Sequence, residues 1–136
     1  MAGTTTFSMI KPDAVKEKHI GAIINMIERA GFSIRAMKLA HFTPQTAALF
    51  YQVHKERPFY GQLCQYMATG PIIAMVLEKE NAVADFRQLI GATDPTKAAK
   101  GTVRARFGSS IEANAIHGSD ADETAVVEAN FFFPSK

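Results

Sequence analysis

The sequence predicts an α+β sandwich, in which one β-sheet is covered by helices. Segments typical of strands and of helices are interspersed along only 136 residues, which is enough chain for one compact domain over residues 1–136 but short for two cores. Hydrophobic residues make up 47% and charged residues 21%, as in globular proteins rather than disordered ones. These patterns leave the order of the strands open.

The first third of the chain is predicted to fold as strand, helix, strand. The apolar run at 7–10 ends just before Pro12, and proline cannot donate to a sheet ladder. Isoleucines at positions 20, 23, 24 and 27 share one face of a helix that Gly31 ends. Alternation of apolar and polar residues from Phe32 to about residue 40 then indicates a second strand.

The middle of the chain is predicted to form two helices and a buried strand. Thr43 before Pro44 is typical of an N-cap and first helical position, so a helix is expected to run from there to about residue 54. After a break at Pro58, a short helix is expected over 59–68. The apolar run at 72–78 follows a Gly-Pro pair and predicts a buried strand.

The next segment begins with a helix and continues without regular pattern. Asn81 is expected to cap a helix over 82–90 that Gly91 ends. From residue 91 to 110 apolar periodicity is weak and glycine and proline are scattered. A long irregular segment inside a compact domain is usually functional or disordered, so this loop is a candidate for part of a site.

The densest polar cluster is the run from Asn114 to Asp120 (NAIHGSD). A strand is expected at 113–117, and a last helix to about residue 130 is expected to open with a capping box of Asp120 and Glu123. A helix N-terminus suits an anion, and His117 just before it has the chemistry of an acid/base, a metal ligand or a nucleophile. Residue types alone equally allow a capped helix with an incidental histidine.

Charge is distributed unevenly. The net charge of +2 arises from 15 basic and 13 acidic residues, which does not indicate a generic polyanion binder. The stretch 91–110 holds four basic residues and one acidic residue, whereas 111–135 holds five acidic residues and no lysine or arginine. This distribution of charge is consistent with either a solvated basic loop beside an acidic helix, or a phosphate site facing carboxylates that help hold a divalent cation. Arg87, about one helical turn before the loop, has the charge to join such a site.

Several classes of site are excluded or disfavoured. Cys64 is the only cysteine, so an intramolecular disulfide and a cysteine metal cluster are excluded. No apolar stretch approaches the ~20 residues of a membrane span, and the start lacks the pattern of a signal peptide, so a cytoplasmic protein is expected. Glycine-rich phosphate motifs are absent. Tyr51 and His54 are predicted to be neighbours on one helix face, where packing on the core is the first interpretation.

Six motifs in the expected order resemble those of the nucleoside diphosphate kinases, and the match extends over nearly the whole chain. The run NAIHGSD at 114–120 resembles the family's signature around its reactive histidine. The other motifs are, in order, FSMIKPDAV at 7–15, YQVHKERPF at 51–59, GP at 70–71, GATDP at 91–95 and GTVR at 101–104.

This resemblance implies a fold and an activity. The fold is a ferredoxin-like sandwich with a four-stranded antiparallel sheet covered by helices. The activity is transfer of the γ-phosphate from a nucleoside triphosphate to a nucleoside diphosphate, with Mg²⁺, through a phosphohistidine in a ping-pong cycle. Broad tolerance of base and sugar is implied, with ATP, GTP and deoxynucleoside diphosphates among the substrates and maintenance of NTP and dNTP pools as the role.

The resemblance also implies roles for individual residues. His117 matches the nucleophile, Glu128 the carboxylate that holds its other ring nitrogen, and Ser119 the hydroxyl that supports this contact. Asp120 matches the residue that helps place Mg²⁺, through water. Lys11 is implied in catalysis as well as binding, and Phe59 as the ring on which the base stacks. The full set implied to contact the nucleotide is Lys11, Tyr51, His54, Phe59, Arg87, Thr93, Arg104 and Asn114.

One departure keeps alternatives open. Arg106 stands where the family commonly has an acidic residue, which motivates the alternative of a catalytically impaired relative that acts as an interaction module. A nucleic-acid-binding role for the basic loop is a further alternative, and the acidic stretch at 111–135 argues against it. Family members are hexamers or tetramers, so a homo-oligomer is expected, with no membrane partner and no dedicated nucleic-acid binding.

Overall fold

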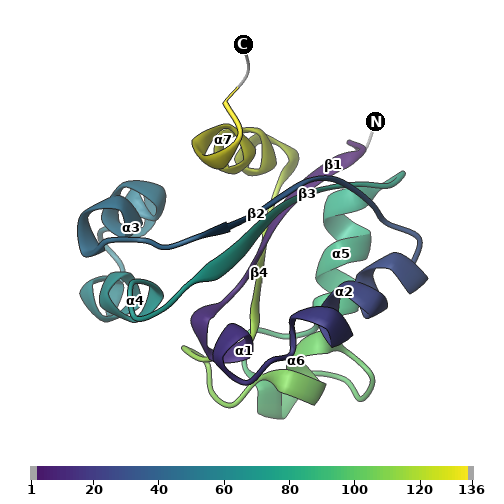
Figure 1. Cartoon of the computed structure of the whole chain (residues 1–136), viewed down its shortest axis with the longest axis horizontal. Helices are drawn as coiled ribbons and strands as arrows, with labels where there is room; N and C mark the ends of the chain where they lie inside the picture. The colour runs from purple at the N-terminus through teal and green to yellow at the C-terminus, as the bar shows by residue number, and fades with distance from the viewer. Residues whose placement is uncertain (1–2, 135–136) are drawn as a thin grey trace.

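The computed structural model describes residues 3–134 and contains a four-stranded antiparallel sheet with helices on its two faces (Figure 1). Its strands are β1 (Thr5–Ile10), β2 (Ser33–Ala40), β3 (Ile72–Glu78) and β4 (Ile116–Gly118). Their order in the sheet is β2-β3-β1-β4, so the first and last strands of the chain lie side by side. This order is the ferredoxin-like arrangement that the resemblance implied, and that expectation is confirmed.

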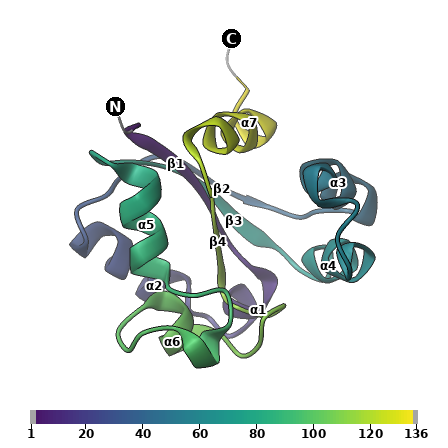
Figure 2. The ribbon, with the colours of Figure 1, turned by 180° about the vertical axis from the view of Figure 1, so that it is seen from behind.

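Helices cover the sheet from two sides, as Figure 2 shows from behind. The helices α2 and α5 lie on one side, and α3, α4 and α7 lie on the other. The helices are α1 (Pro12–Lys16), α2 (Ile20–Arg29), α3 (Pro44–Phe50), α4 (Tyr60–Met67), α5 (Ala82–Ile90), α6 (Val103–Phe107) and α7 (Asp122–Phe132), with 3-10 turns η1 (Gln52–His54) and η2 (Pro95–Lys97). Within residues 3–134, no helix combines the length and apolarity needed to cross a membrane.

The core has two layers because successive side chains of the central strands point to opposite faces of the sheet. Phe7 and Met9 of β1 are fully buried on the face that packs against α3, α4 and α7. Ile10 is buried on the opposite face, against α2 and α5. A strand that is buried on both faces reads as a nearly continuous apolar run, which is why β1 and β3 were predicted well.

The N-cap predicted at Thr43 is confirmed. Its side chain accepts a hydrogen bond from the backbone N–H of Thr46 (3.1 Å), and the Thr46 hydroxyl accepts one from the backbone N–H of Thr43 (2.8 Å). Pro44 occupies the first turn of α3, where its missing N–H costs nothing. This helix is shorter than predicted, since α3 ends at Phe50 and residues 52–54 form the 3-10 turn η1.

Asn81 is the N-cap residue of α5, as predicted, but its side chain makes no cap bond, and the capping box predicted at Asp120 and Glu123 is wrong. Asn81 precedes α5 with a left-handed φ of 56°, and its amide donates to Asp85 Oδ1 (3.1 Å) instead of accepting a backbone N–H. The capping box of Asp120 and Glu123 does not form, because Ala121 is the N-cap of α7 and makes no side-chain cap bond. The Asp120 carboxylate instead accepts a hydrogen bond from the Thr124 hydroxyl (2.6 Å).

The segment predicted to be irregular contains two short helical pieces, η2 and α6. Asp94 caps η2 by accepting from the Thr96 N–H (3.0 Å), and Thr102 caps α6 by accepting from the Ala105 N–H (3.3 Å). The five residues of α6 are too few to show a helical period in the sequence. The last strand also begins later than predicted, at Ile116, because the residues before it form a tight turn.

Candidate active site

A pocket of about 580 Å³ opens beside β4. It gathers residues that are up to about 117 positions apart in the sequence, because the sheet order places β4 next to β1. Eleven of the twelve predicted site residues line it, namely Lys11, Tyr51, His54, Phe59, Arg87, Thr93, Arg104, Asn114, His117, Asp120 and Glu128. Ser119 is fully buried and lies behind Glu128.

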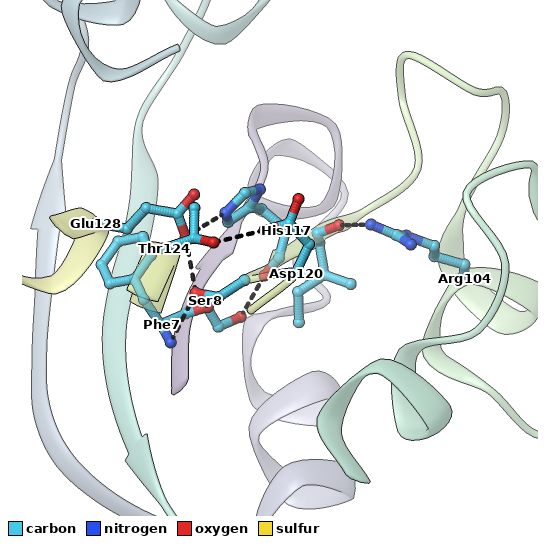
Figure 3. Close-up of polar contacts among 9 residues, drawn as sticks. Phe7, Ser8, Arg104, His117, Asp120, Thr124 and Glu128 are labelled. Atoms are coloured by element: carbon cyan, nitrogen blue, oxygen red, sulfur yellow. Dashed lines mark hydrogen bonds and ion pairs between the residues drawn. The ribbon is translucent and has the colours of Figure 1, made fainter. Parts of the chain in front are cut away.

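His117 lies in the middle of β4 and is held by one carboxylate. Its Nε2 is 3.0 Å from Glu128 Oε1, and both side chains are labelled in Figure 3. The Ser119 hydroxyl donates to the same oxygen at 2.7 Å. An ionised carboxylate only accepts, so this contact places the imidazole proton on Nε2 and leaves the lone pair on Nδ1. Within residues 3–134, Nδ1 has no hydrogen-bond partner. A neutral imidazole held in this way has its lone pair on Nδ1 and its orientation set by the carboxylate.

Aromatic rings enclose the His117 side chain. The rings of Phe50, Tyr51 and Phe7 have their centroids 5.8, 6.2 and 6.2 Å from the imidazole centroid. The Phe50 and Tyr51 rings meet it nearly edge-on, at interplanar angles of 75° and 86°. Tyr51 is thus partly the core residue that its spacing suggested, and burial raises the pKa of its hydroxyl well above the ordinary value. These contacts restrict the rotation of the imidazole.

The backbone of β4 is fixed to β1 by two serines. The Ser8 hydroxyl donates to the His117 carbonyl (2.8 Å), and the Ser119 backbone N–H donates to the Phe7 carbonyl (3.1 Å). Sequence analysis did not single out Ser8, whose only signal is a polar residue in an otherwise apolar strand. In Figure 3, Phe7 and Ser8 lie on one side of His117, and Arg104 reaches toward the strand from the other side.

Two buried cations lie at the inner end of the pocket. Lys11 Nζ donates to the Glu112 carbonyl (2.7 Å) and to Asn114 Oδ1 (3.0 Å), and its burial lowers its pKa to about 8. Arg104 donates to the carbonyls of Gly91 (3.0 Å) and Ile116 (2.7 Å). Burial, and secondarily the charge of Arg87, lowers the pKa of Arg104 to about 10.

One guanidinium nitrogen of Arg104 is left without a partner. Its Nε is buried and makes no hydrogen bond within residues 3–134. Arg87 lines the same pocket from α5 and is exposed. Buried positive charge that is only partly compensated favours an anion in the pocket.

Asp120 and Thr93 complete the polar wall. The pKa of Asp120 lies below its ordinary value, chiefly because Thr124 donates to the carboxylate and also because Arg87 and His54 are near, so this side chain is ionised. The Thr93 carbonyl accepts from the Asn114 amide (3.0 Å), which connects the loop after α5 to the turn before β4.

Phe59 stands at the outer end of the pocket. It is 74% exposed and holds a left-handed φ of 68° just before α4. An exposed aromatic ring in a sparsely populated backbone conformation is uncommon away from functional sites. Leu63 and Ile111, which the sequence analysis did not single out, also line the pocket.

Arg106 does not line this pocket. Its guanidinium lies over the Phe107 ring, 5.0 Å from the centroid, and its side chain is exposed. The residue at which the sequence departs from the family pattern therefore packs on α6 itself and is not among the residues that line the pocket.

A ferredoxin-like sheet that presents a carboxylate-held histidine to a cation-lined pocket has the groups that a phosphotransferase needs. Comparison with known proteins identifies the family within the phosphotransferases. The sequence profile described as nucleoside diphosphate kinase matches residues 4–136. The nucleoside diphosphate kinase of Flavobacterium psychrophilum is 55% identical over 136 residues, covering 100% of this chain and 98% of that protein. That of Chlorobium luteolum is 57% identical over 131 residues, covering 96% of this chain and 94% of that protein.

Solved structures agree. The Aquifex aeolicus nucleoside diphosphate kinase superposes with a TM-score of 0.94 at 42% identity, over 97% of this chain and 96% of that one. The halophilic enzyme from Halobacterium salinarum, solved in complex with CDP, superposes with a TM-score of 0.92 at 36% identity, over 98% of this chain and 89% of that one. The chain belongs to the nucleoside diphosphate kinase family, whose members transfer phosphate between nucleoside triphosphates and diphosphates.

Proposed function

We propose that this chain transfers the γ-phosphate through His117. In the first half-reaction the Nδ1 lone pair attacks the γ-phosphorus, the bond from that phosphorus to the β–γ bridging oxygen breaks, and the nucleoside diphosphate leaves. In the second, a terminal β-phosphate oxygen of another nucleoside diphosphate attacks the phosphohistidine, and the nitrogen–phosphorus bond breaks. The observation that carries the proposal is the contact of Glu128 with Nε2, because it leaves Nδ1 as the nucleophile.

Glu128 and Ser119 act on the nucleophile. Positive charge develops on the imidazole as Nδ1 bonds to phosphorus, and a carboxylate 3.0 Å from Nε2 stabilises that charge. The Ser119 hydroxyl keeps the carboxylate in place by donating to the same oxygen. The aromatic rings around His117 hold the imidazole plane, so little reorganisation accompanies the attack.

The cations of the pocket bind the phosphates. Phosphoryl transfer is catalysed mainly by positioning and by stabilisation of charge on the phosphate oxygens. Arg87 and Arg104 offer guanidinium groups for this, with Thr93 as a smaller hydrogen-bond donor, and His54 and Tyr51 lie beside them. Lys11 and Asn114, which hydrogen-bond each other, are assigned to the ribose hydroxyls and the adjacent phosphate.

The pocket fits Mg²⁺ bound mainly by substrate. Within residues 3–134, no group of three or more histidine, cysteine, aspartate or glutamate side chains is placed to hold a metal. Mg²⁺ in nucleotide sites is usually held by one or two carboxylates together with phosphates and water. Asp120 supplies one ionised carboxylate at the pocket and would hold the ion through water. The ion would neutralise charge on the phosphates.

Recognition of the base is assigned to Phe59. Stacking on an aromatic ring is available to every base, so it gives affinity with little discrimination. The Halobacterium salinarum relative was solved with CDP, a pyrimidine nucleotide, in accord with such tolerance. We assign to this chain ATP, GTP and deoxynucleoside diphosphates as substrates, homo-oligomers as the working form, and the cytoplasm as its location, where it would maintain nucleoside triphosphate pools.

Labelling of the protein tests the proposal. Wild-type protein mixed with Mg²⁺ and ATP carrying a radioactive γ-phosphate should acquire acid-labile label, and added GDP should remove it as GTP. His117→Ala should acquire none. His41→Ala removes an exposed histidine whose Nε2 is bonded to the Ala68 carbonyl (3.1 Å), so it serves as the matched control and should label normally. Unlabelled wild type, or equal label in His117→Ala, rejects the proposal.

A further inference from the structure

The residue before β4 holds an unusual backbone conformation. Ala115 has a φ of 77° although it is not glycine, and it is fully buried. The Ile116 N–H donates to the Asn114 carbonyl two residues earlier (3.0 Å), which makes this a γ-turn centred on Ala115. A γ-turn with positive φ at its centre is rare and strained. Such a turn persists only where its surroundings hold it.

The backbone of Ala115 is held at two points by the segment that begins α1. The Ala115 carbonyl accepts from the backbone N–H of Lys11 (2.8 Å). The Ala115 N–H donates to the carboxylate oxygen Oδ2 of Asp13 (3.0 Å). The proposed mechanism uses Lys11 for the nucleotide, but it gives no role to Asp13.

Asp13 is in turn held by Tyr66 on α4. The Tyr66 hydroxyl donates to Asp13 Oδ1 (2.5 Å), so the two oxygens of the carboxylate contact two different segments. Burial, and secondarily Asp13, keeps the pKa of Tyr66 above its ordinary value, so its hydroxyl remains a donor at neutral pH. The Lys11 ammonium lies 5.7 Å from the centroid of the same ring. Tyr66 therefore contacts the site through Lys11 and supports the turn through Asp13.

We propose that Asp13, held by Tyr66, is a positioning residue that maintains the strained turn at Ala115. The turn lies between Asn114, which is bonded to Lys11 and to the Thr93 carbonyl, and His117 in β4. Relaxation of Ala115 to an ordinary φ would change the direction of the chain between these two residues. The carboxylate of Asp13 thus keeps Asn114 and His117 in their mutual geometry without touching the nucleotide.

This inference rests on the proposed function of His117, and its test uses glycine as a rescue. Asp13→Ala should lower kcat/KM for phosphate transfer about 30-fold, a loss in the range of one charge-assisted hydrogen bond. Tyr66→Phe keeps the ring near Lys11 and removes the hydroxyl, and should lower kcat/KM about fivefold. Ala115→Gly in the Asp13→Ala background should restore transfer to within about threefold of wild type, because glycine adopts positive φ without strain.

Two control variants distinguish loss of the contact to Ala115 from the effects of removing any nearby carboxylate or relieving backbone strain elsewhere. Glu17→Ala removes an exposed carboxylate at the end of the same helix and should leave transfer unchanged. Lys18 also has a positive φ, of 65°, so Lys18→Gly relieves similar strain away from the pocket. Combined with Asp13→Ala, Lys18→Gly should not restore transfer.

Amide hydrogen exchange gives a readout that is independent of activity. Exchange at the Ala115 N–H should accelerate at least tenfold in Asp13→Ala and in Tyr66→Phe, and remain unchanged in Glu17→Ala. If Asp13→Ala does not fold, Tyr66→Phe alone and with Ala115→Gly carries the same comparison. Wild type that forms no phosphohistidine rejects the proposed function, while the exchange data still test the turn. Wild type that is labelled, with Asp13→Ala fully active or with its loss not rescued by Ala115→Gly, overturns the inference.

Discussion

Replacement of Glu128 by glutamine tests whether the carboxylate sets the tautomer of His117 and stabilises its developing positive charge. The carboxamide keeps the shape of the side chain but carries no charge. Its oxygen can still accept from Nε2, in which case the developing imidazolium loses its counter-charge. If its NH₂ group faces the ring instead, the proton moves to Nδ1 and the lone pair needed for attack is lost. Either outcome slows formation of the phosphohistidine.

The size of this effect follows from the geometry. Nε2 and Oε1 are 3.0 Å apart, and the histidine and glutamate side chains are only 19% and 12% exposed, so water screens the pair weakly. At an effective dielectric constant of about 20, two unit charges at that separation attract by roughly 5 kcal/mol before desolvation is counted. Hydrogen bonds to charged groups contribute about 1.5–3 kcal/mol net. We take about 2 kcal/mol, which is a rate decrease of about 30-fold.

Rapid-quench measurement of the labelling rate at saturating Mg²⁺-ATP is the appropriate assay. Glu128→Gln should form phosphohistidine about 30-fold more slowly, while its dissociation constant for ADP stays within twofold of wild type. Glu123→Gln removes an exposed carboxylate from the first turn of the same helix and should label at the wild-type rate. A Glu128→Gln rate within threefold of wild type would refute the assigned role of the carboxylate. So would a loss that appears entirely in ADP binding.

Two further predictions concern the two ends of the pocket. Burial lowers the pKa of Lys11 to about 8, so kcat/KM should fall as the pH rises through this value and the ammonium loses its proton. Lys11→Met should show low activity and no such fall at alkaline pH. If the fall persists in this variant, the group that titrates is not Lys11. Phe59→Ala should raise the KM for ADP, GDP and CDP by a similar factor of about 5 to 100, the range expected for loss of one base-stacking ring. Steady-state kinetics with the three acceptor nucleotides measure this change. An effect confined to one base would contradict non-selective stacking.

The sequence predicted most of the regular elements because their patterns are local. The apolar runs of β1 and β3 and the isoleucine face of α2 are patterns that lie within short stretches of sequence. The Thr43 cap was also predicted correctly, since its partner is only three residues away. The helix α1 was missed because its five residues begin directly after a strand and show no period.

Predictions that depended on a choice between local partners were less successful. Asp120 has the residue type and spacing of a cap, but its carboxylate is bonded to Thr124 and lines the pocket. Asn81 similarly bonds to Asp85 instead of the helix backbone. Polar side chains of this kind have several partners within reach, and the packing of the surrounding elements decides between them.

By itself the sequence determined the chemical groups of the site, because the motif at 114–120 and the cations of the loop can be recognised from residue types and short spacings. Only the tertiary structure decided how they meet. Antiparallel pairing places Met9 opposite His117 across β1 and β4 and brings Lys11 to Asn114, over 100 residues away. The choice of neighbouring strand, the contact of the Glu128 carboxylate with His117 and the strained turn at Ala115 depend on how separate elements pack, and short sequence patterns do not specify such contacts.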